Sequence, residues 1–139
     1  RQKIDTTFNA AGAASATLTA AQSGTLFLIN GAANNVITLP ALSTGNVGVT
    51  YDFFLTVAVG GSVTTTIVLP GSAVSDFQAM LSLVAGTAAN AASDVAGDTL
   101  TLVNSTVANA RVSMTCVSDD GTNSKWMTTA LSTPIATVA

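Results

Sequence analysis

The side chains best suited to chemistry in this chain are acidic and amide groups near its C-terminal end. Asp119, Asp120 and Asn123 lie close together in the sequence, and their oxygen atoms are ligands that Ca²⁺ takes in proteins. Their spacing does not follow an EF-hand loop, and an Asp-Gly turn between two strands explains the same residues without a metal. We therefore expect a turn here. The weaker alternative is a small ligand site of Asp119, Asp120, Asn123 and Trp126, in which the indole stacks on a sugar.

Other catalytic groups are scarce. The chain has no His, and all seven acidic residues are Asp. Without His, a Ser-His or Cys-His nucleophile pair and a His-ligated zinc site are impossible. The glycine motifs of phosphate-binding loops and nucleophile elbows are also missing. We predict that the protein is not an enzyme, with no catalytic residue, no cofactor and no resident metal.

The lone cysteine, Cys116, alternates with Val112 and Met114 in a strand-like pattern. This pattern predicts a buried, unreactive thiol.

The charge content excludes further classes. Only 8% of the 139 residues are charged, and four Lys and Arg residues against seven acids give a net charge of −3. Scattered cations on an acidic chain do not form a patch that neutralises phosphates, so nucleic acid is not an expected partner. No apolar run approaches the roughly 18 residues of a membrane span, so no membrane partner is expected either. The cations of Arg1–Asp5 are not followed by an apolar run, which argues against a signal peptide.

The elements that position these groups are expected to be strands. Ala, Thr and Val dominate the chain, and β-branched residues suit a pleated surface. Alternating or short apolar runs predict strands over 25–29, 36–39, 49–59, 62–69, 98–103, 111–117 and 125–131. Asn30-Gly31 and Gly60-Gly61 are turn signals, and each predicts a hairpin between the strands beside it.

The remaining segments complete the predicted organisation. The spacing of Val74, Phe77, Leu81 and Val84 predicts a short helix over 73–85. The expected fold is an antiparallel β-sandwich or barrel of about seven or eight strands, with one domain over 18–131. Residues 1–17 are expected to form an N-terminal arm that docks on a neighbouring subunit, or else a frayed terminus. Residues 132–139 form a C-terminal tail.

Two parts of the chain resemble segments of tailed-bacteriophage virion proteins. The first is Leu18–Asn30 followed by Val36–Pro40, with its "T-x-x-x-S-G" and "T-L-P" motifs. The second is Gly97–Leu102 with Asp120–Trp126, which is similar to a closing "D-G-T-N-W" hairpin, although Ser124 and Lys125 separate the Asn from the Trp. Such modules occur in head decoration (cement) proteins and in tail fibres or spikes, and many assemble as trimers.

The resemblance implies a structural virion protein. A fibre is usually long and repetitive. This sequence predicts one compact domain of 139 residues without an internal repeat, which favours a decoration protein. The expected function is to bind the major capsid protein on the outer capsid surface as a homotrimer and stabilise the head. The candidate capsid contacts are Arg1, Lys3, Ile4 and Phe8. The alternatives are a tail-fibre, spike or baseplate module, a small carbohydrate-binding module, and a pilin-like or surface-layer subunit.

Overall fold

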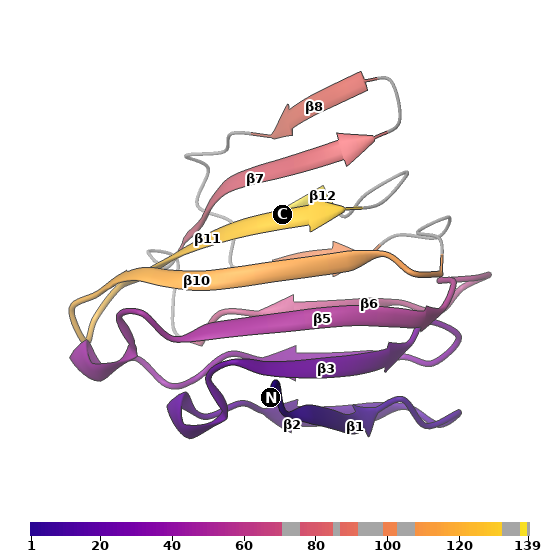
Figure 1. The fold of residues 1–139 in the computed structure, drawn as a ribbon, viewed down its shortest axis with the longest axis horizontal. Helices are drawn as coiled ribbons and strands as arrows, with labels where there is room; N and C mark the ends of the chain where they lie inside the picture. Colours follow the sequence, from indigo (N-terminus) through magenta and orange to yellow (C-terminus); the bar gives the residue numbers. More distant parts are fainter. Residues whose placement is uncertain (71–75, 85–86, 92–98, 103–107, 132–136, 139) are drawn as a thin grey trace.

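The computed structural model describes residues 1–70, 76–84, 87–91, 99–102, 108–131 and 137–138. These residues are mainly β-structure and form two mixed sheets that are not closed into a barrel (Figure 1). The larger sheet has the order β1 (Ile4–Phe8), β3 (Thr25–Asn30), β5 (Thr50–Val57), β10 (Arg111–Asp119), β11 (Ser124–Leu131), β7 (Asp76–Val84) and β8 (Thr87–Ala91). The smaller sheet has the order β12 (Thr137–Val138), β9 (Thr99–Leu102), β6 (Thr65–Val68), β4 (Asn35–Thr38) and β2 (Ala14–Thr17).

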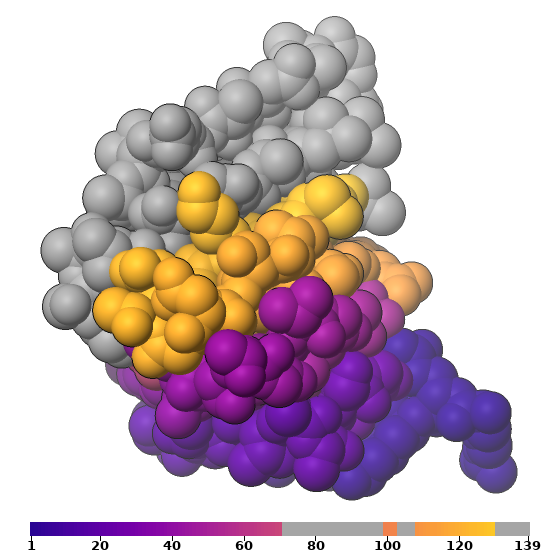
Figure 2. All heavy atoms as spheres, turned by 90° about the vertical axis from the view of Figure 1, so that its left-hand side faces the viewer, coloured from indigo at the N-terminus to yellow at the C-terminus, as the bar shows by residue number. Residues whose placement is uncertain are grey.

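The first six strands form three successive coils, in which the chain makes one strand of the larger sheet and then one of the smaller. The coils are β1–β2, β3–β4 and β5–β6, and each lies parallel to the next in both sheets. Short 3-10 turns, η1 (Ala20–Gln22) and η2 (Thr44–Asn46), lead from one coil to the next. Figure 2 shows the coils layered in chain order, from the indigo N-terminal end towards the orange and yellow strands β10 and β11.

The coil is a structural repeat, and its length differs along the chain: strands β2 and β4 pair at an offset of 21 residues, whereas β4 and β6 pair at an offset of 30. All four β2–β4 pairs join residues 21 positions apart, from Ala14↔Asn35 to Thr17↔Thr38. At the same offset, six positions carry identical residues: Asn9/Asn30, Ala11/Ala32, Thr17/Thr38, Leu18/Leu39, Ala20/Ala41 and Gly24/Gly45.

The two predicted hairpins around Asn30-Gly31 and Gly60-Gly61 are wrong as hairpins, although both sites do turn. The turns link strands of different sheets, so each is an arch rather than an antiparallel pair. Gly31 explains why the first arch is tight: its amide donates to the Val57 carbonyl oxygen at 3.1 Å. A Cβ atom built on Gly31 would lie 2.4 Å from that oxygen, so only glycine allows this approach.

Other fold predictions are corrected in the same way. The sheets are mixed rather than antiparallel, and the described strands number seven and five, more than the seven or eight expected. The helix predicted over 73–85 is a strand, β7, which pairs in parallel with β11; residues 73–75 and 85 lie outside the described residues. Periodicity alone does not separate a short buried strand from a helix, and pairing with β11 decides the outcome here.

One hydrophobic core lies between the sheets. It is built from the inward-facing residues, which alternate with outward-facing ones along each strand. The rings of Phe8, Phe27 and Phe53 follow one another across the coils, with centroid separations of 6.1 Å and 5.6 Å. Tyr51 then stacks on Trp126, which connects the coils to the C-terminal hairpin β10–β11. This hairpin and its turn at Asp119–Asn123 confirm the predicted turn.

Candidate interaction surface

Asp119 holds two parts of the fold together and is not open to a ligand. Its carboxylate is 6% exposed and accepts hydrogen bonds from the Ser43 amide at 3.1 Å, the Asn46 side-chain amide at 2.8 Å and the Gly121 amide at 2.9 Å. The first two donors belong to the connection between the second and third coils, and the third belongs to the β10–β11 turn. The carboxylate therefore anchors the coils to the hairpin, a role that sequence reasoning missed because Ser43 and Asn46 are distant in the chain.

Asp120 and Asn123 form the exposed end of the same turn. The Asp120 carboxylate accepts hydrogen bonds from the amides of Asn123 and Thr122 at 2.7 Å and 2.8 Å. These two backbone hydrogen bonds lower the pKa of Asp120. The carboxylates of Asp119 and Asp120 thus both act within the turn. Among the described residues, no group of three or more potential metal-ligating side chains is present.

Trp126 does not offer a platform for a sugar. Its side chain is 1% exposed, and its ring stacks on Tyr51 with a centroid separation of 5.8 Å and an interplanar angle of 16°. Tyr51 in turn donates its hydroxyl hydrogen to the Thr19 carbonyl oxygen at 2.8 Å. The four residues of the weaker ligand-site prediction are therefore near one another, but the only aromatic ring among them faces the core.

Cys116 is buried beside Tyr51 and Trp126, at 1% exposure. Burial, with a smaller contribution from the charge of Asp119, raises the pKa of its thiol to about 11. The prediction of a buried thiol is confirmed.

The four candidate capsid contacts near the N-terminus separate into two kinds. Arg1 and Lys3 are exposed, and Ile4 is 60% exposed, so all three are available to a partner. Phe8 is 1% exposed and belongs to the core. Most of the segment 1–17 is incorporated in the two sheets: β1 pairs with β3, and β2 pairs with β4.

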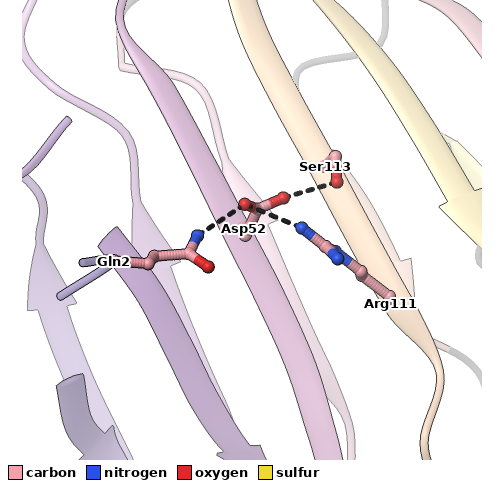
Figure 3. A network of polar contacts seen from close by, with 4 residues as sticks. All are labelled: Gln2, Asp52, Arg111 and Ser113. Carbon is pink, nitrogen blue, oxygen red and sulfur yellow. Dashed lines mark hydrogen bonds and ion pairs between the residues drawn. The ribbon is translucent and has the colours of Figure 1, made fainter. Parts of the chain in front are cut away.

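A polar network lies on the outer face of the larger sheet and fastens the start of the chain to it (Figure 3). Asp52 on β5 accepts hydrogen bonds from Gln2 at 2.8 Å and from the Ser113 hydroxyl, and its carboxylate lies 2.9 Å from the Arg111 guanidinium. Burial alone raises the pKa of Asp52, but the hydrogen bonds from Ser113, Arg111 and Gln2 outweigh it, so the pKa is lowered. The network therefore fastens the start of the chain to two strands, β5 and β10, by charge and hydrogen bonding.

The outer face around this network carries few other charges and is partly apolar. Register places Ile4, Leu26 and Asp52 in one row across the larger sheet, and Leu28, Phe54 and Arg111 in the next. Further along the face, Val117 and Met127 are 45% and 47% exposed. This face can bury apolar area against a partner, and its charged features are the Asp52–Arg111 ion pair and the exposed Lys125, which lies on the same side of β11 as Met127.

The N-terminal coil leaves an open edge in both sheets, because β1 and β2 are each the last strand of their sheet. The sequence contains no Asp, Glu, Lys or Arg between Asp5 and Asp52, so the first two coils carry almost no charge. This uncharged stretch was a signal in the sequence that could have drawn attention to the edge. The arrangement suits association with another protein surface.

No helix among the described residues is long and apolar enough to span a membrane. Comparisons of the chain with protein-family models, curated sequences and solved structures found no match.

Proposed function

We propose that this chain is a structural virion protein that binds the outer surface of a tailed-phage capsid as an oligomer and stabilises the head. The observation that carries the proposal is the uncharged stretch between Asp5 and Asp52, which folds into stacked coils and ends in an open edge of both sheets. Covering a surface of this kind has a small desolvation penalty, because the surface carries few charges. The motif resemblance to virion proteins supplies the kind of partner.

The architecture supports a mechanical role. The two sheets pack as an open sandwich around one continuous core, and the Asp52 network and the Asp119 anchor each join the coils to the hairpin β10–β11. A unit fastened across its strands can transmit load between the subunits that it touches. Burial of roughly 1,200–2,000 Å² would suffice for stable attachment to a capsid.

The exposed residues of the first coil are the proposed capsid contacts. Arg1, Lys3 and Ile4 lie beside the open edge, and Phe8 anchors their strand in the core. Deleting the segment 1–17 would remove two strands and a core residue, so point substitutions are the cleaner test of these contacts.

The test uses purified protein and capsids of tailed phages prepared without their decoration protein. Wild-type chain is expected to cosediment with the capsids and to appear on their outer surface in electron microscopy. Ile4→Asp is expected to lower occupancy at least tenfold, whereas Thr122→Asp, at an exposed turn away from the edge, retains it. If the wild-type protein binds none of the capsids, the proposed function is contradicted. If both variants reach equal occupancy, the proposed contact at Ile4 is contradicted.

A second candidate is a tail-fibre or spike module, and the repeated coils favour it. Stacked coils are a way to build elongated parts, and the three coils of this chain are a structural repeat of that kind. Antibody labelling of intact virions separates the two candidates, because a fibre module places the label on the tail and a decoration protein places it on the head.

The carbohydrate-binding module is the least favoured candidate, because the ring of Trp126 is buried. A glycan array, run with and without a chelator, is expected to show no binding in either condition.

A further inference from the structure

The backbone of β2 presents hydrogen-bonding groups that no described residue takes. Strand β2 lies parallel to β4 without a register shift, and the amides of Ala14 and Leu18 donate to the carbonyl oxygens of Asn34 and Thr38 at 3.2 Å and 2.8 Å. Backbone groups alternate in direction along a strand. The amide and carbonyl groups of Ser15 and Thr17 therefore point away from β4, towards the open edge.

Strand β1, the other strand at this end of the molecule, is protected against pairing. Its register with β3 shifts between Asp5 and Phe8. The Asp5 carboxylate accepts the Thr7 amide at 2.9 Å, and the Thr6 carbonyl oxygen accepts the Asn9 amide at 3.0 Å. Bulges, charges and internally satisfied groups are the devices by which proteins prevent edge pairing.

Strand β2 is short, at four residues, but it has no bulge, charge or internally satisfied edge group. Its sequence, Ala14-Ser15-Ala16-Thr17, holds no charge and no proline, and its pairing with β4 contains no bulge. The contrast between two neighbouring edges of one molecule indicates that the β2 edge is kept open for a partner strand.

The hydrophobic core extends to the β2 edge of the smaller sheet. Register aligns Ile67, Ile37 and Ala16 along the smaller sheet; both isoleucines are fully buried, whereas Ala16 is only partly buried and packs against the core. Ala14 is partly buried in the same way. Covering the edge with a further strand would complete the burial of both alanines.

We propose that two copies of this chain associate through antiparallel pairing of their β2 strands about a twofold axis at Ala16. Ser15 then faces Thr17 of the partner subunit, and the reciprocal pair forms on the other side of the axis. Each pair exchanges two backbone hydrogen bonds, so four form in total. The two Ala16 side chains meet on the axis, where their small size lets the strands approach.

The occupant is a second copy because the edge is complementary to itself. Donors and acceptors match in this register, and the absence of charge between Asp5 and Asp52 means that self-association brings no like charges together along β2. A charged or basic partner strand would find no opposite charge there. The contact differs from the threefold assembly that the resemblance implies. It uses β2 in the smaller sheet, whereas the proposed capsid contacts Arg1, Lys3 and Ile4 lie at β1 in the larger sheet, so it does not depend on capsid binding.

The first experiment measures mass by analytical ultracentrifugation from about 1 µM to about 1 mM, the range in which a four-residue edge contact of modest area would dissociate. Wild type is expected to shift from monomer to dimer. Thr17→Lys places a charge on the exposed face of β2 and is expected to weaken the dimer at least tenfold. Thr122→Lys makes the same change at the exposed β10–β11 turn and is expected to leave it unchanged.

A second variant and a second readout keep the proposal testable if a charge alone disturbs folding. Thr17→Pro removes an outward-pointing amide hydrogen and no donor to β4, and proline is tolerated on an edge strand, so the β2–β4 hydrogen bonds are expected to remain while the dimer is abolished. Tryptophan fluorescence checks that each variant is folded. In wild type, hydrogen exchange at the Ser15 and Thr17 amides should slow as concentration rises.

Three results would overturn the proposal: a wild-type monomer at all concentrations, a trimer, or a dimer that persists in folded Thr17→Lys and Thr17→Pro variants. None of these results depends on capsids, so failure here leaves the proposed function to its own test.

Discussion

The guanidinium of Arg111 lies 2.9 Å from the carboxylate of Asp52 on the neighbouring strand β5. Gln2 donates to the same carboxylate from the first residues of the chain. Asp52 is therefore the point at which the N-terminus, the third coil and the C-terminal hairpin are joined by charge and hydrogen bonding rather than by the core (Figure 3).

The lowered pKa of Asp52 predicts an acid-sensitive contribution to stability. Because the folded state lowers the pKa, the contribution is fully present above the ordinary value of 3.8 and is lost as pH falls through the lower folded value. Asp52→Asn is expected to reduce the free energy of unfolding by about 1 kcal/mol at pH 7, since the site is partly exposed. Urea unfolding at several pH values should show this gap closing below about pH 4. A gap that stays constant down to pH 2 would assign the effect to packing.

Gly31 is predicted to be intolerant of any side chain. Gly31→Ala would place a Cβ atom 2.4 Å from the Val57 carbonyl oxygen, so the arch must shift, and the expected loss is about 2–4 kcal/mol of unfolding free energy. Gly60→Ala is the matched control, because a Cβ atom there meets nothing within 4 Å. Thermal unfolding measures both variants. Equal melting temperatures would show that the close approach at Gly31 is not a constraint.

Asp119 is predicted to matter for stability and not for metal binding. Asp119→Ala leaves the Ser43 amide without its acceptor and removes one of the two acceptors of the Asn46 side-chain amide, which is expected to cost about 2–3 kcal/mol. Asp120→Ala, in the exposed part of the same turn, should shift the denaturation midpoint less. Neither calcium nor a chelator is expected to move the wild-type melting temperature; a rise with calcium that disappears in Asp119→Ala would establish a metal site.

Cys116 is predicted to be unreactive in the folded protein. Burial raises its pKa to about 11, so the thiolate is scarce at pH 8 and the sulfur is enclosed. Iodoacetamide labelling at pH 8 should proceed only as fast as the protein unfolds, and mass spectrometry measures it. Rapid labelling of folded protein, at the rate seen in denaturant, would contradict this assignment of the thiol.

The sequence predicted β3, β4, β5, β6, β9, β10 and β11 because alternation of apolar residues reports burial directly, but it missed β1, β2 and β7. Tyr51, Phe53 and Leu55 face the core as their spacing indicates. Alternation does not report which sheet a strand joins. Asn30-Gly31 serves a hairpin or an arch equally, and the distinction depends on the approach to Val57, a residue in the next coil.

The candidate site was less predictable than the fold. Asp119 and Trp126 have the residue types of a ligand site, but their contacts with Asn46 and Tyr51 commit them to the structure. Conversely, the small residues of β2 give no signal of an edge in the sequence, because an open edge is defined by backbone groups and not by side-chain chemistry. The helix prediction over 73–85 was wrong for a related reason: the strand pairs with β11, which lies much later in the sequence.

The arches also determine the order in which the chain can fold. In the coils, strands that pair within a sheet are separated by a whole coil of sequence, and of the described strands only β7–β8 and β10–β11 pair with their immediate successors. Joining distant strands requires closing long loops, which slows folding. We expect the nucleus to form at the β10–β11 hairpin, close to the C-terminus, with the larger sheet growing from there towards β1. The N-terminal coils would then wait until β10 and β11, which are synthesised after them, become available, and their uncharged strands would remain unpaired until then.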